Sequence, residues 1–322
     1  MKKLTVRFAA SLLTIFITAQ SVSAAELLIP VGQVVGLEIG EDRVTIDGFD
    51  SRIGQAARAA GLREGDRIVT IDDMPIHCPQ DVKLALQYSD GDIEMVVDRG
   101  NDTKEVELEP MITQDGPKLG IYLRQGITGV GTVTYYDPDT KRFGALGHGV
   151  NGKDGGLAVM TEGFAYAASV EAVKKGKSGD PGQLIGTVTD KTPIGNLAKN
   201  TIQGVFGTVD VPFRGDALPT AAISEIQAGP AIIRSTIHNG TVQEYSVEIM
   251  KIYPHSSADG RNMLIKVTDP RLLATTGGIV QGMSGSPIIQ GGKLVGAVTH
   301  VLVNDPQTGY GIFIENMLDA AA

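Results

Sequence analysis

Short apolar runs, separated by turn residues, fill the chain from residue 111 to its end at 322. Residues 131–136 and 143–146 are two such runs, and the Asp-Pro-Asp-Thr segment between them, 137–140, predicts a hairpin turn. Further runs follow at similar intervals as far as 264–267. Short strands at regular spacing are typical of a β-barrel or a β-sandwich. We therefore expect a mainly β unit over residues 111–322.

A second pattern covers residues 26–110. Residues 55–60 are rich in Ala and Arg, and 81–89 carry apolar residues at helical spacing, so both segments predict short helices. Apolar runs at 93–97 and 106–108 flank a polar turn and predict a hairpin. Helices and strands mixed in this way predict a separate α+β domain ahead of the β unit.

The first 25 residues differ from both patterns. Lys2, Lys3 and Arg7 precede an uncharged segment, 8–25, which ends in small residues. This is the pattern of a signal peptide that is cleaved during export, or of an uncleaved membrane anchor. In either case we expect the rest of the chain to lie outside the cytoplasm.

Composition narrows the classes of function. The chain carries 28 Lys and Arg against 37 Asp and Glu, a net charge of −9, and has no basic cluster, which argues against a nucleic-acid partner. Its single cysteine, Cys78, excludes an intrachain disulfide and a zinc site built from cysteines. The five histidines show no metal-ligand spacing. We expect neither a metal nor an organic cofactor.

The candidate chemistry begins at Ser284, which lies in the segment Gly-Met-Ser-Gly-Ser-Pro that starts at Gly282. Glycine adopts backbone angles that other residues resist, so such a turn can expose the Ser284 hydroxyl and aim the N–H groups of Gly282 and Ser284 at one point. Acyl transfer needs both a nucleophile and an oxyanion hole. Ser286 is the competing nucleophile, and an ordinary Gly/Ser turn before a hairpin is the alternative without chemistry.

His148 is the candidate base. It lies in the segment Gly-Ala-Leu-Gly-His-Gly, just past the strand predicted at 143–146. A serine hydroxyl is a poor nucleophile at neutral pH, and an imidazole titrates in the range that a general base requires. A structural or solvent-facing histidine is the alternative.

Long motifs around these residues resemble one known family. GALGHG at 144–149, TDP at 268–270, TGGIVQGMSGSPIIQ at 276–290 and VGAVTHVLVNDPQTGYGIF at 295–313 are similar to the S55 family of serine peptidases, which is generally grouped with chymotrypsin-like proteases. The resemblance implies a double β-barrel with the active site between the barrels. It also implies a serine endopeptidase over residues 111–322.

The third member of the catalytic triad is assigned by the resemblance to Asp269, so that the triad is His148, Asp269 and Ser284. Chymotrypsin-like proteases usually place this acid much earlier in the chain, and three other carboxylates remain as alternatives. These are Asp180, Asp210 and Asp216. Asp269 is also compatible with a simple Asp-Pro turn before Arg271.

Specificity is expected to involve His300. The segment 296–301 lies where chymotrypsin-like folds build a wall of the S1 pocket, and a single buried polar contact there discriminates strongly between substrates. An imidazole at this place can donate a hydrogen bond to a Gln, a Glu or a small polar side chain. The alternative is that His300 points away from the pocket.

The N-terminal half resembles a PDZ domain of the bacterial protease type, chiefly in AGLREGDRIVTIDDMPI at 60–76. Such domains add an extended peptide to a sheet edge and hold its carboxylate with backbone N–H groups. We expect the matching loop at Val35, Gly36 and Leu37. The alternative is a small domain that only spaces the peptidase from the membrane.

The family resemblance also implies a physiological role. It indicates regulatory proteolysis in sporulation signalling, with cleavage of the enzyme's own N-terminal region and of a membrane regulator of sigma-factor processing. In a spore former the protein would act in the space between the forespore and mother-cell membranes. Two alternatives remain, a catalytically silent binding protein and a different hydrolase such as an esterase, although the residues around Ser284 do not fit the G-x-S-x-G pattern.

Overall fold

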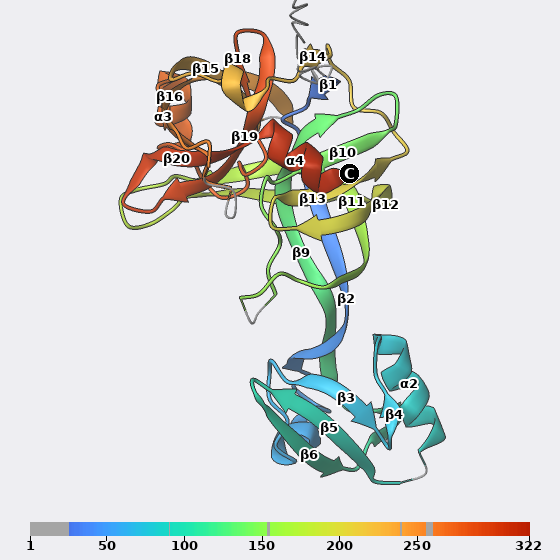
Figure 1. Ribbon diagram of the computed structural model, residues 1–322. Coiled ribbons are helices and arrows are strands. Elements are labelled where there is room, and N and C mark those ends of the chain that lie inside the picture. Colours follow the sequence, from blue (N-terminus) through green and yellow to red (C-terminus); the bar gives the residue numbers. More distant parts are fainter. Residues whose placement is uncertain (1–25, 90, 153–154, 239, 256–259) are drawn as a thin grey trace, which may run out of the picture.

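A computed structural model describes residues 26–89, 91–152, 155–238, 240–255 and 260–322 of the chain. Strands dominate these residues, which form two β-barrels and a small mixed domain (Figure 1). Each of the three has a hydrophobic core of its own. The predicted mainly β fold is confirmed. The predicted signal peptide or anchor at 1–25 lies outside the described residues.

The first barrel closes because two of its long strands, the first and the last in the order around it, pair with each other. Its strands, in order around the barrel, are β9 (Ile121–Tyr136), β10 (Arg142–Ala145), β13 (Gly204–Val209), β12 (Gln183–Thr201), β11 (Met160–Lys174) and β2 (Val34–Phe49). The hairpin predicted around 137–140 is the β9–β10 connection, with Phe143 opposite Tyr136. Val35, Val133 and Phe143 are among the side chains that fill this barrel.

The second barrel is formed entirely by the later part of the chain. Its strands, in order, are β15 (Gly229–His238), β16 (Thr241–Ile252), β17 (Met263–Val267), β20 (Asp305–Phe313), β19 (Lys293–Leu302) and β18 (Pro287–Gln290), and β18 returns to β15. Ile233, Ile265 and Val298 lie in its core. The two barrels together are the double β-barrel that we predicted.

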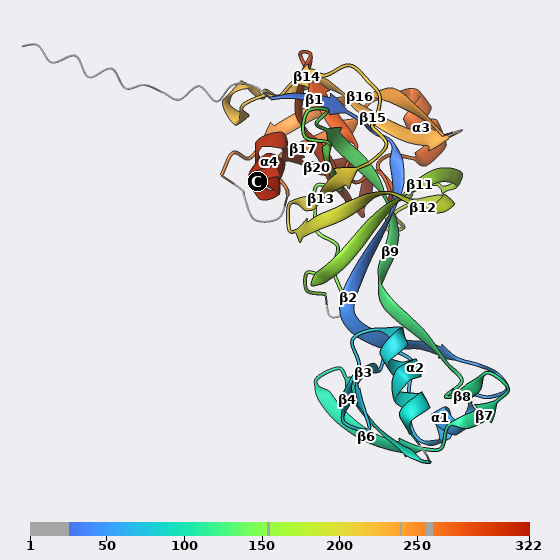
Figure 2. The same cartoon turned by 90° about the vertical axis from the view of Figure 1, so that its right-hand side faces the viewer.

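The small domain is connected to the first barrel by the parts of β2 and β9 that extend beyond that barrel. Both views show these parts as a two-stranded ribbon (Figures 1 and 2). The pairing of these strands runs from Val34↔Thr132 to Phe49↔Ile121 and shifts register between Ile39 and Val44. Gly126 lies opposite this shift with φ of +87°, and a Cβ there would come within 2.0 Å of the Ile39 carbonyl oxygen. Glycine is therefore required where the ribbon leaves the barrel.

Two helices and short strands complete the small domain. They are α1 (Gln55–Ala59), β3 (Arg67–Ile71), β4 (Met74–Pro75), α2 (Pro79–Tyr88), β5 (Ile93–Arg99), β6 (Asp102–Leu108), β7 (Met111–Thr113) and β8 (Gly116–Lys118). The core of this domain runs from Val44 to Leu123. Both predicted helices and the predicted β5–β6 hairpin are present.

The predicted boundaries of the small domain need correction. Residues 26–40 belong to the first barrel, and the small domain extends beyond 110 to the start of β9. The reason is physical: β2 and β9 pass through both units, so the apolar pattern continues across each boundary.

The peptide-binding loop predicted at Val35, Gly36 and Leu37 is also wrong. These residues lie in the first-barrel half of β2, with β9 paired on one side and β11 on the other. An extended peptide needs an unpaired strand edge. Both edges of β2 are occupied here, and a Cβ at Gly36 would come within 2.7 Å of the Val188 side chain.

Four elements remain. β1 (Leu27–Pro30) pairs with β9 of the first barrel on one side and with β14 (Leu218–Pro219) on the other. The 3₁₀ turn η1 (Ile223–Glu225) and α3 (Pro270–Thr276) pack Ile223 and Leu272 against the core of the second barrel. The closing helix α4 (Ile314–Ala321) packs Ile314 and Met317 against residues of both barrels, including Phe206 and Leu294. No helix in the described part of the chain is both long and apolar enough to span a membrane.

Candidate active site

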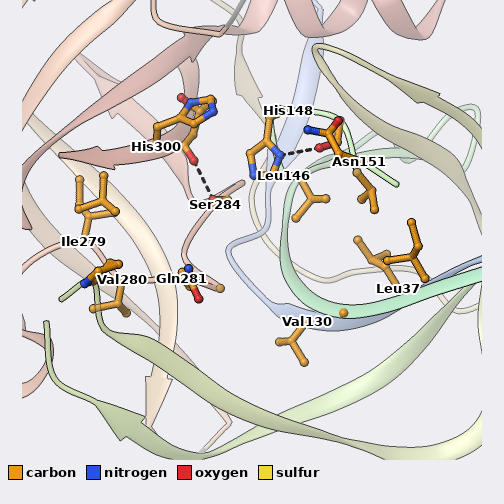
Figure 3. A pocket seen from close by; sticks show the side chains of 18 of the residues that line it. Leu37, Val130, Leu146, His148, Asn151, Ile279, Val280, Gln281, Ser284 and His300 are labelled. Atoms are coloured by element: carbon orange, nitrogen blue, oxygen red, sulfur yellow. Dashed lines mark hydrogen bonds between the residues drawn. The ribbon is translucent and has the colours of Figure 1, made fainter. Parts of the chain in front are cut away.

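A cleft of about 800 Å³ lies between the two barrels (Figure 3). The first barrel lines it with residues of β2 and β9, such as Leu37 and Val130, and with His148 and the residues that follow β10. The second barrel contributes Ser284 and His300. The structure thus brings the predicted nucleophile, base and pocket histidine into one cavity.

Ser284 stands on the tight turn between α3 and β18. Gly282 and Gly285 flank it with φ of +95° and +94°. A Cβ on Gly285 would lie only 2.0 Å from the Thr132 carbonyl oxygen, so no other residue fits there. Neither the Gly282 N–H nor the Ser284 N–H donates to an acceptor among the residues that the structure describes, and both residues line the cleft. These are the properties that an oxyanion hole requires.

The hydroxyls of Ser284 and Ser286 differ in accessibility. Ser284 lines the cleft, and its Oγ donates to the main-chain oxygen of Thr299 at 2.7 Å. The Ser286 side chain is wholly buried, and its Oγ donates to the Ser235 Oγ at 3.1 Å. A substrate entering the cleft can therefore meet Ser284, whereas Ser286 is a core residue.

His148 follows β10 after two residues with left-handed backbone, Leu146 and Gly147, at φ of +68° and +70°. Its Nδ1 lies 2.8 Å from the Gly149 carbonyl oxygen. A carbonyl only accepts, so Nδ1 carries the proton and Nε2 is left as the acceptor. Burial lowers the pKa of His148, while the Gly149 carbonyl acts in the opposite direction. The imidazole is therefore kept neutral, as a general base must be.

Asp269 does not play the role predicted for it. It is the N-cap of α3, where its carboxylate accepts from the N–H groups of Arg271, Leu272 and Ser246 at 2.9, 3.3 and 3.3 Å. The Arg271 guanidinium adds two further bonds, at 3.2 and 2.9 Å. Hydrogen bonding by Arg271, followed by the backbone N–H groups, lowers the pKa of Asp269 to about 2 against the opposing effect of burial. We therefore correct the assignment: Asp269 caps a helix and does not orient His148.

The alternative carboxylates do not replace Asp269. Asp180, Asp210 and Asp216 are all exposed, and Asp180 pairs with Lys174 at 2.8 Å. No Asp or Glu occurs among the described residues that line the cleft. In this structure the group that orients His148 is the Gly149 carbonyl.

Sequence reasoning missed two residues that support the site. The Asn200 side chain accepts from the Val150 N–H and donates to the Val150 and Ala158 carbonyls, each at 2.9 Å, so it braces the segment after His148. Thr132 contacts the nucleophile turn from β9. Both lie in ordinary strand sequence, and no local motif marks them.

His300 lies on β19 and lines the cleft beside the apolar residues Ile279, Val280 and Val301. Its ring centroid is 5.4 Å from that of His148. The position is compatible with the pocket role predicted from the sequence, and the role itself stays a prediction.

A second groove, of about 530 Å³, lies in the small domain between α2 and the start of β9. Val82 and Leu86 of α2 face Ile121 and Leu123 across it, and Tyr122 stands at its edge. On this half of β9 the pairing partner is β2. The predicted peptide-binding segment at Val35–Leu37 has no such apolar groove beside an unpaired strand edge.

A protein-family model described as SpoIVB peptidase S55 matches residues 115–318, well over half of the chain. Among solved structures, the chain is similar to the active form of the Rv3671c protease from M. tuberculosis, at 15% identity and a TM-score of 0.36 over 61% of this chain and 73% of that one. The inactive form of that protease gives 14% identity and a TM-score of 0.37 over 60% and 84%.

The HtrA-type protease AlgW, solved with a decapeptide, is similar at 10% identity and a TM-score of 0.38. The similarity covers 65% of this chain and 57% of AlgW. No curated protein matches the chain.

Proposed function

We propose, since this chain belongs to the SpoIVB peptidase S55 family of serine peptidases, that it is an endopeptidase in which Ser284 is the nucleophile and His148 the general base. One observation carries the proposal. Ser284 and His148 come from different barrels, yet they line the same cleft, and the N–H groups beside Ser284 are open to that cleft.

The first step requires a rotation of the Ser284 side chain. Its Oγ leaves the Thr299 carbonyl and donates to Nε2 of His148, which takes the proton as Oγ attacks the scissile carbonyl carbon. The resulting oxyanion accepts from the N–H groups of Gly282 and Ser284. Each such donor is worth about 3 kcal/mol of transition-state stabilisation in serine proteases.

The second half of the reaction reuses the same groups. His148 returns its proton to the leaving amine, and the C–N bond breaks to give an ester on Ser284. Water then attacks that ester, His148 takes the water proton, and Ser284 leaves with it. The Gly149 carbonyl keeps the reactive tautomer throughout, although it offers the imidazolium only a partial negative charge.

The substrates are proteins or peptides, as the family implies. We assign the pocket beside Ile279 and Val280 to the P1 side chain, with His300 as its polar contact. A polar P1 residue, such as Gln or Glu, suits a pocket whose apolar walls carry one imidazole.

The physiological proposal rests on the family resemblance. The enzyme acts outside the cytoplasm in sporulation signalling, where it trims its own N-terminal region and cleaves a membrane regulator of sigma-factor processing. We propose the groove between α2 and β9 as the place where the small domain, acting as a PDZ module, holds a peptide end.

The competing function is a catalytically silent binding protein. The hydrogen bond from Ser284 to Thr299 favours it, because the hydroxyl is directed to a carbonyl that cannot accept its proton in catalysis. The two functions differ in one simple result, which is whether the protein cleaves a peptide bond.

Mass spectrometry of the purified full chain tests the proposal without a known substrate. Wild-type protein is expected to lose an N-terminal segment with time, while Ser284→Ala stays at full length. Equal trimming of both proteins would overturn the role of Ser284. An intact wild-type protein that also leaves every peptide of a library uncut would favour the silent binding protein.

A further inference from the structure

Thr132 on β9 makes two hydrogen bonds to the nucleophile turn. Its N–H donates to the Ser284 carbonyl at 3.1 Å, and its Oγ1 donates to the Gly282 carbonyl at 2.7 Å. The side chain is wholly buried, so water cannot replace the hydroxyl. One residue of the first barrel thus holds the turn of the second barrel at two points.

These bonds fix the two peptide units on either side of the Ser284 N–H. In the unit before it, the Gly282 carbonyl is held by Thr132, and the Met283 N–H donates to Val280 at 3.1 Å. In the unit after it, the Ser284 carbonyl is held by Thr132, and the Gly285 N–H donates to Val298 at 2.7 Å. A peptide unit between two fixed neighbours cannot turn over, so the Ser284 N–H, which has no acceptor among the described residues, keeps its direction beside the cleft that Ser284 lines.

Thr132 also contacts the segment that leads from β10 to His148. Its carbonyl oxygen accepts from the Leu146 N–H at 3.1 Å, two residues before His148. The nucleophile turn and the base are therefore joined through a single residue, although they lie more than 130 positions apart in the chain.

We propose that Thr132 is a positioning residue, whose hydroxyl holds the oxyanion-hole turn in place relative to His148. The inference rests on the proposed role of Ser284 as the nucleophile. Preorganised donors contribute most when they need no reorientation during the reaction, so loss of the Oγ1 bond is expected to slow acylation and to leave binding unchanged.

Thr134 provides a matched control. It lies two residues further along β9, where the pairing with β10 shifts register, and it is also wholly buried. Its Oγ1 has no hydrogen-bond partner among the residues that the structure describes. Replacing either threonine by valine makes the same chemical change, but only Thr132→Val removes a bond to the nucleophile turn.

The test is the rate at which a fluorophosphonate probe labels Ser284 in the full chain. We expect Thr132→Val to lower the maximal labelling rate roughly 10- to 100-fold, which is less than the loss of a whole oxyanion donor, with the half-saturating probe concentration and the pH midpoint unchanged. Thr132→Ser restores the hydroxyl, and we expect it to label within about 3-fold of wild type, as does Thr134→Val.

Each outcome is decisive. Wild-type labelling rates in a folded Thr132→Val protein, or equal losses in Thr132→Val and Thr134→Val, would overturn the positioning role while leaving Ser284 as the nucleophile. Absence of a Ser284 adduct in the wild type would overturn the nucleophile and the inference together. If Thr132→Val does not fold, the labelling rates of Thr132→Cys and Thr132→Ser are compared instead. The two side chains are similar in size, but a thiol is a poor hydrogen-bond donor.

Discussion

The Ser284 hydroxyl donates to the main-chain oxygen of Thr299, 2.7 Å away, while Nδ1 of His148 is engaged by the Gly149 carbonyl. The proposed nucleophile and the proposed base therefore each have a backbone partner of their own within a shared cleft. In the mechanism that we propose, the Ser284 side chain rotates about its Cα–Cβ bond and its hydroxyl donates to Nε2 of His148, which is left to accept. The carboxylate predicted beside the histidine is instead bound at the start of α3.

The first prediction separates the two serines of the Gly-Met-Ser-Gly-Ser segment. Ser284→Ala is expected to abolish self-trimming, because the attacking oxygen is lost. Ser286→Ala is expected to keep it, because that hydroxyl only bonds Ser235 inside the barrel. Leaving the Ser235 hydroxyl unpaired is expected to lower the free energy of unfolding by about 1–3 kcal/mol. A trimming assay measures the effect on activity, and thermal unfolding measures the effect on stability. Loss of trimming only in Ser286→Ala would make Ser286 the nucleophile instead of Ser284.

The second prediction concerns Asp269. If it caps α3, Asp269→Asn keeps an acceptor at the cap, and the maximal labelling rate of Ser284 stays within about 3-fold of wild type. Asp269→Ala removes the cap and lowers the free energy of unfolding by about 1 kcal/mol, again with little change in labelling. A triad acid behaves differently, because its Asn variant lowers turnover by about 10⁴-fold. A loss of that size in folded Asp269→Asn would restore the triad.

The third prediction concerns acid stability. The folded pKa of Asp269 is lowered from 3.8 to about 2, so its ionised form stabilises the fold at every pH above its unfolded value. This contribution is lost as the pH falls from about 4 to about 2. Chemical unfolding of the wild type should show that loss, and Asp269→Ala should show a flatter slope over the same interval. Equal slopes in the two proteins would contradict the ion pair with Arg271.

The fourth prediction concerns the pH dependence of the reaction. Burial lowers the pKa of His148, so the neutral base persists to a lower pH than a free imidazole does. The labelling rate of Ser284 should therefore rise with pH through a midpoint below 6.5, the ordinary histidine value. A midpoint above 6.5 would require a carboxylate partner, which raises the pKa of a histidine.

The fifth prediction concerns the groove of the small domain. Gln87 is an exposed residue of α2 that lines the groove, and Gln55 is an exposed residue of α1 that does not. Peptides with free C-termini are first selected from a library by binding to the full-length Ser284→Ala protein. They should bind at least about 10-fold more weakly when Gln87→Trp is added, because the indole fills the groove. They should bind with unchanged affinity when Gln55→Trp is added instead. Selection of no peptide, or equal binding by both variants, would exclude the groove as a peptide site.

The parts of the site that the sequence could predict are local. Ser284 lies between Gly282 and Gly285, and His148 directly follows Gly147. All three glycines have a left-handed backbone, so the composition of a short window reveals both functional side chains. Thr132 and Asn200 act through contacts with residues about 150 and 50 positions away. Such contacts form only when the barrels close, so no local sequence motif or residue spacing predicts them.

The wrong predictions have equally specific causes. Asp269 precedes a proline, and an Asp-Pro pair is a typical start of a helix. In the structure Asp269 is the N-cap of α3, so the pair marks a helix start here. Gly36 interrupts an apolar run and resembles a loop, whereas in the structure it lets β2 pass close to Val188. The fold class was easier to predict from the sequence, because it depends on the combined pattern of many strands and turns.

The central claim is that Ser284 is the nucleophile and that His148 activates it. Its most direct test is mass spectrometric mapping of the residue modified by a fluorophosphonate probe in the wild type, Ser284→Ala and His148→Ala. We predict one adduct, on Ser284 in the wild type, absent from Ser284→Ala and formed at least about 10³-fold more slowly in folded His148→Ala. An adduct on Ser286 or elsewhere, or undiminished labelling without His148, would contradict the claim.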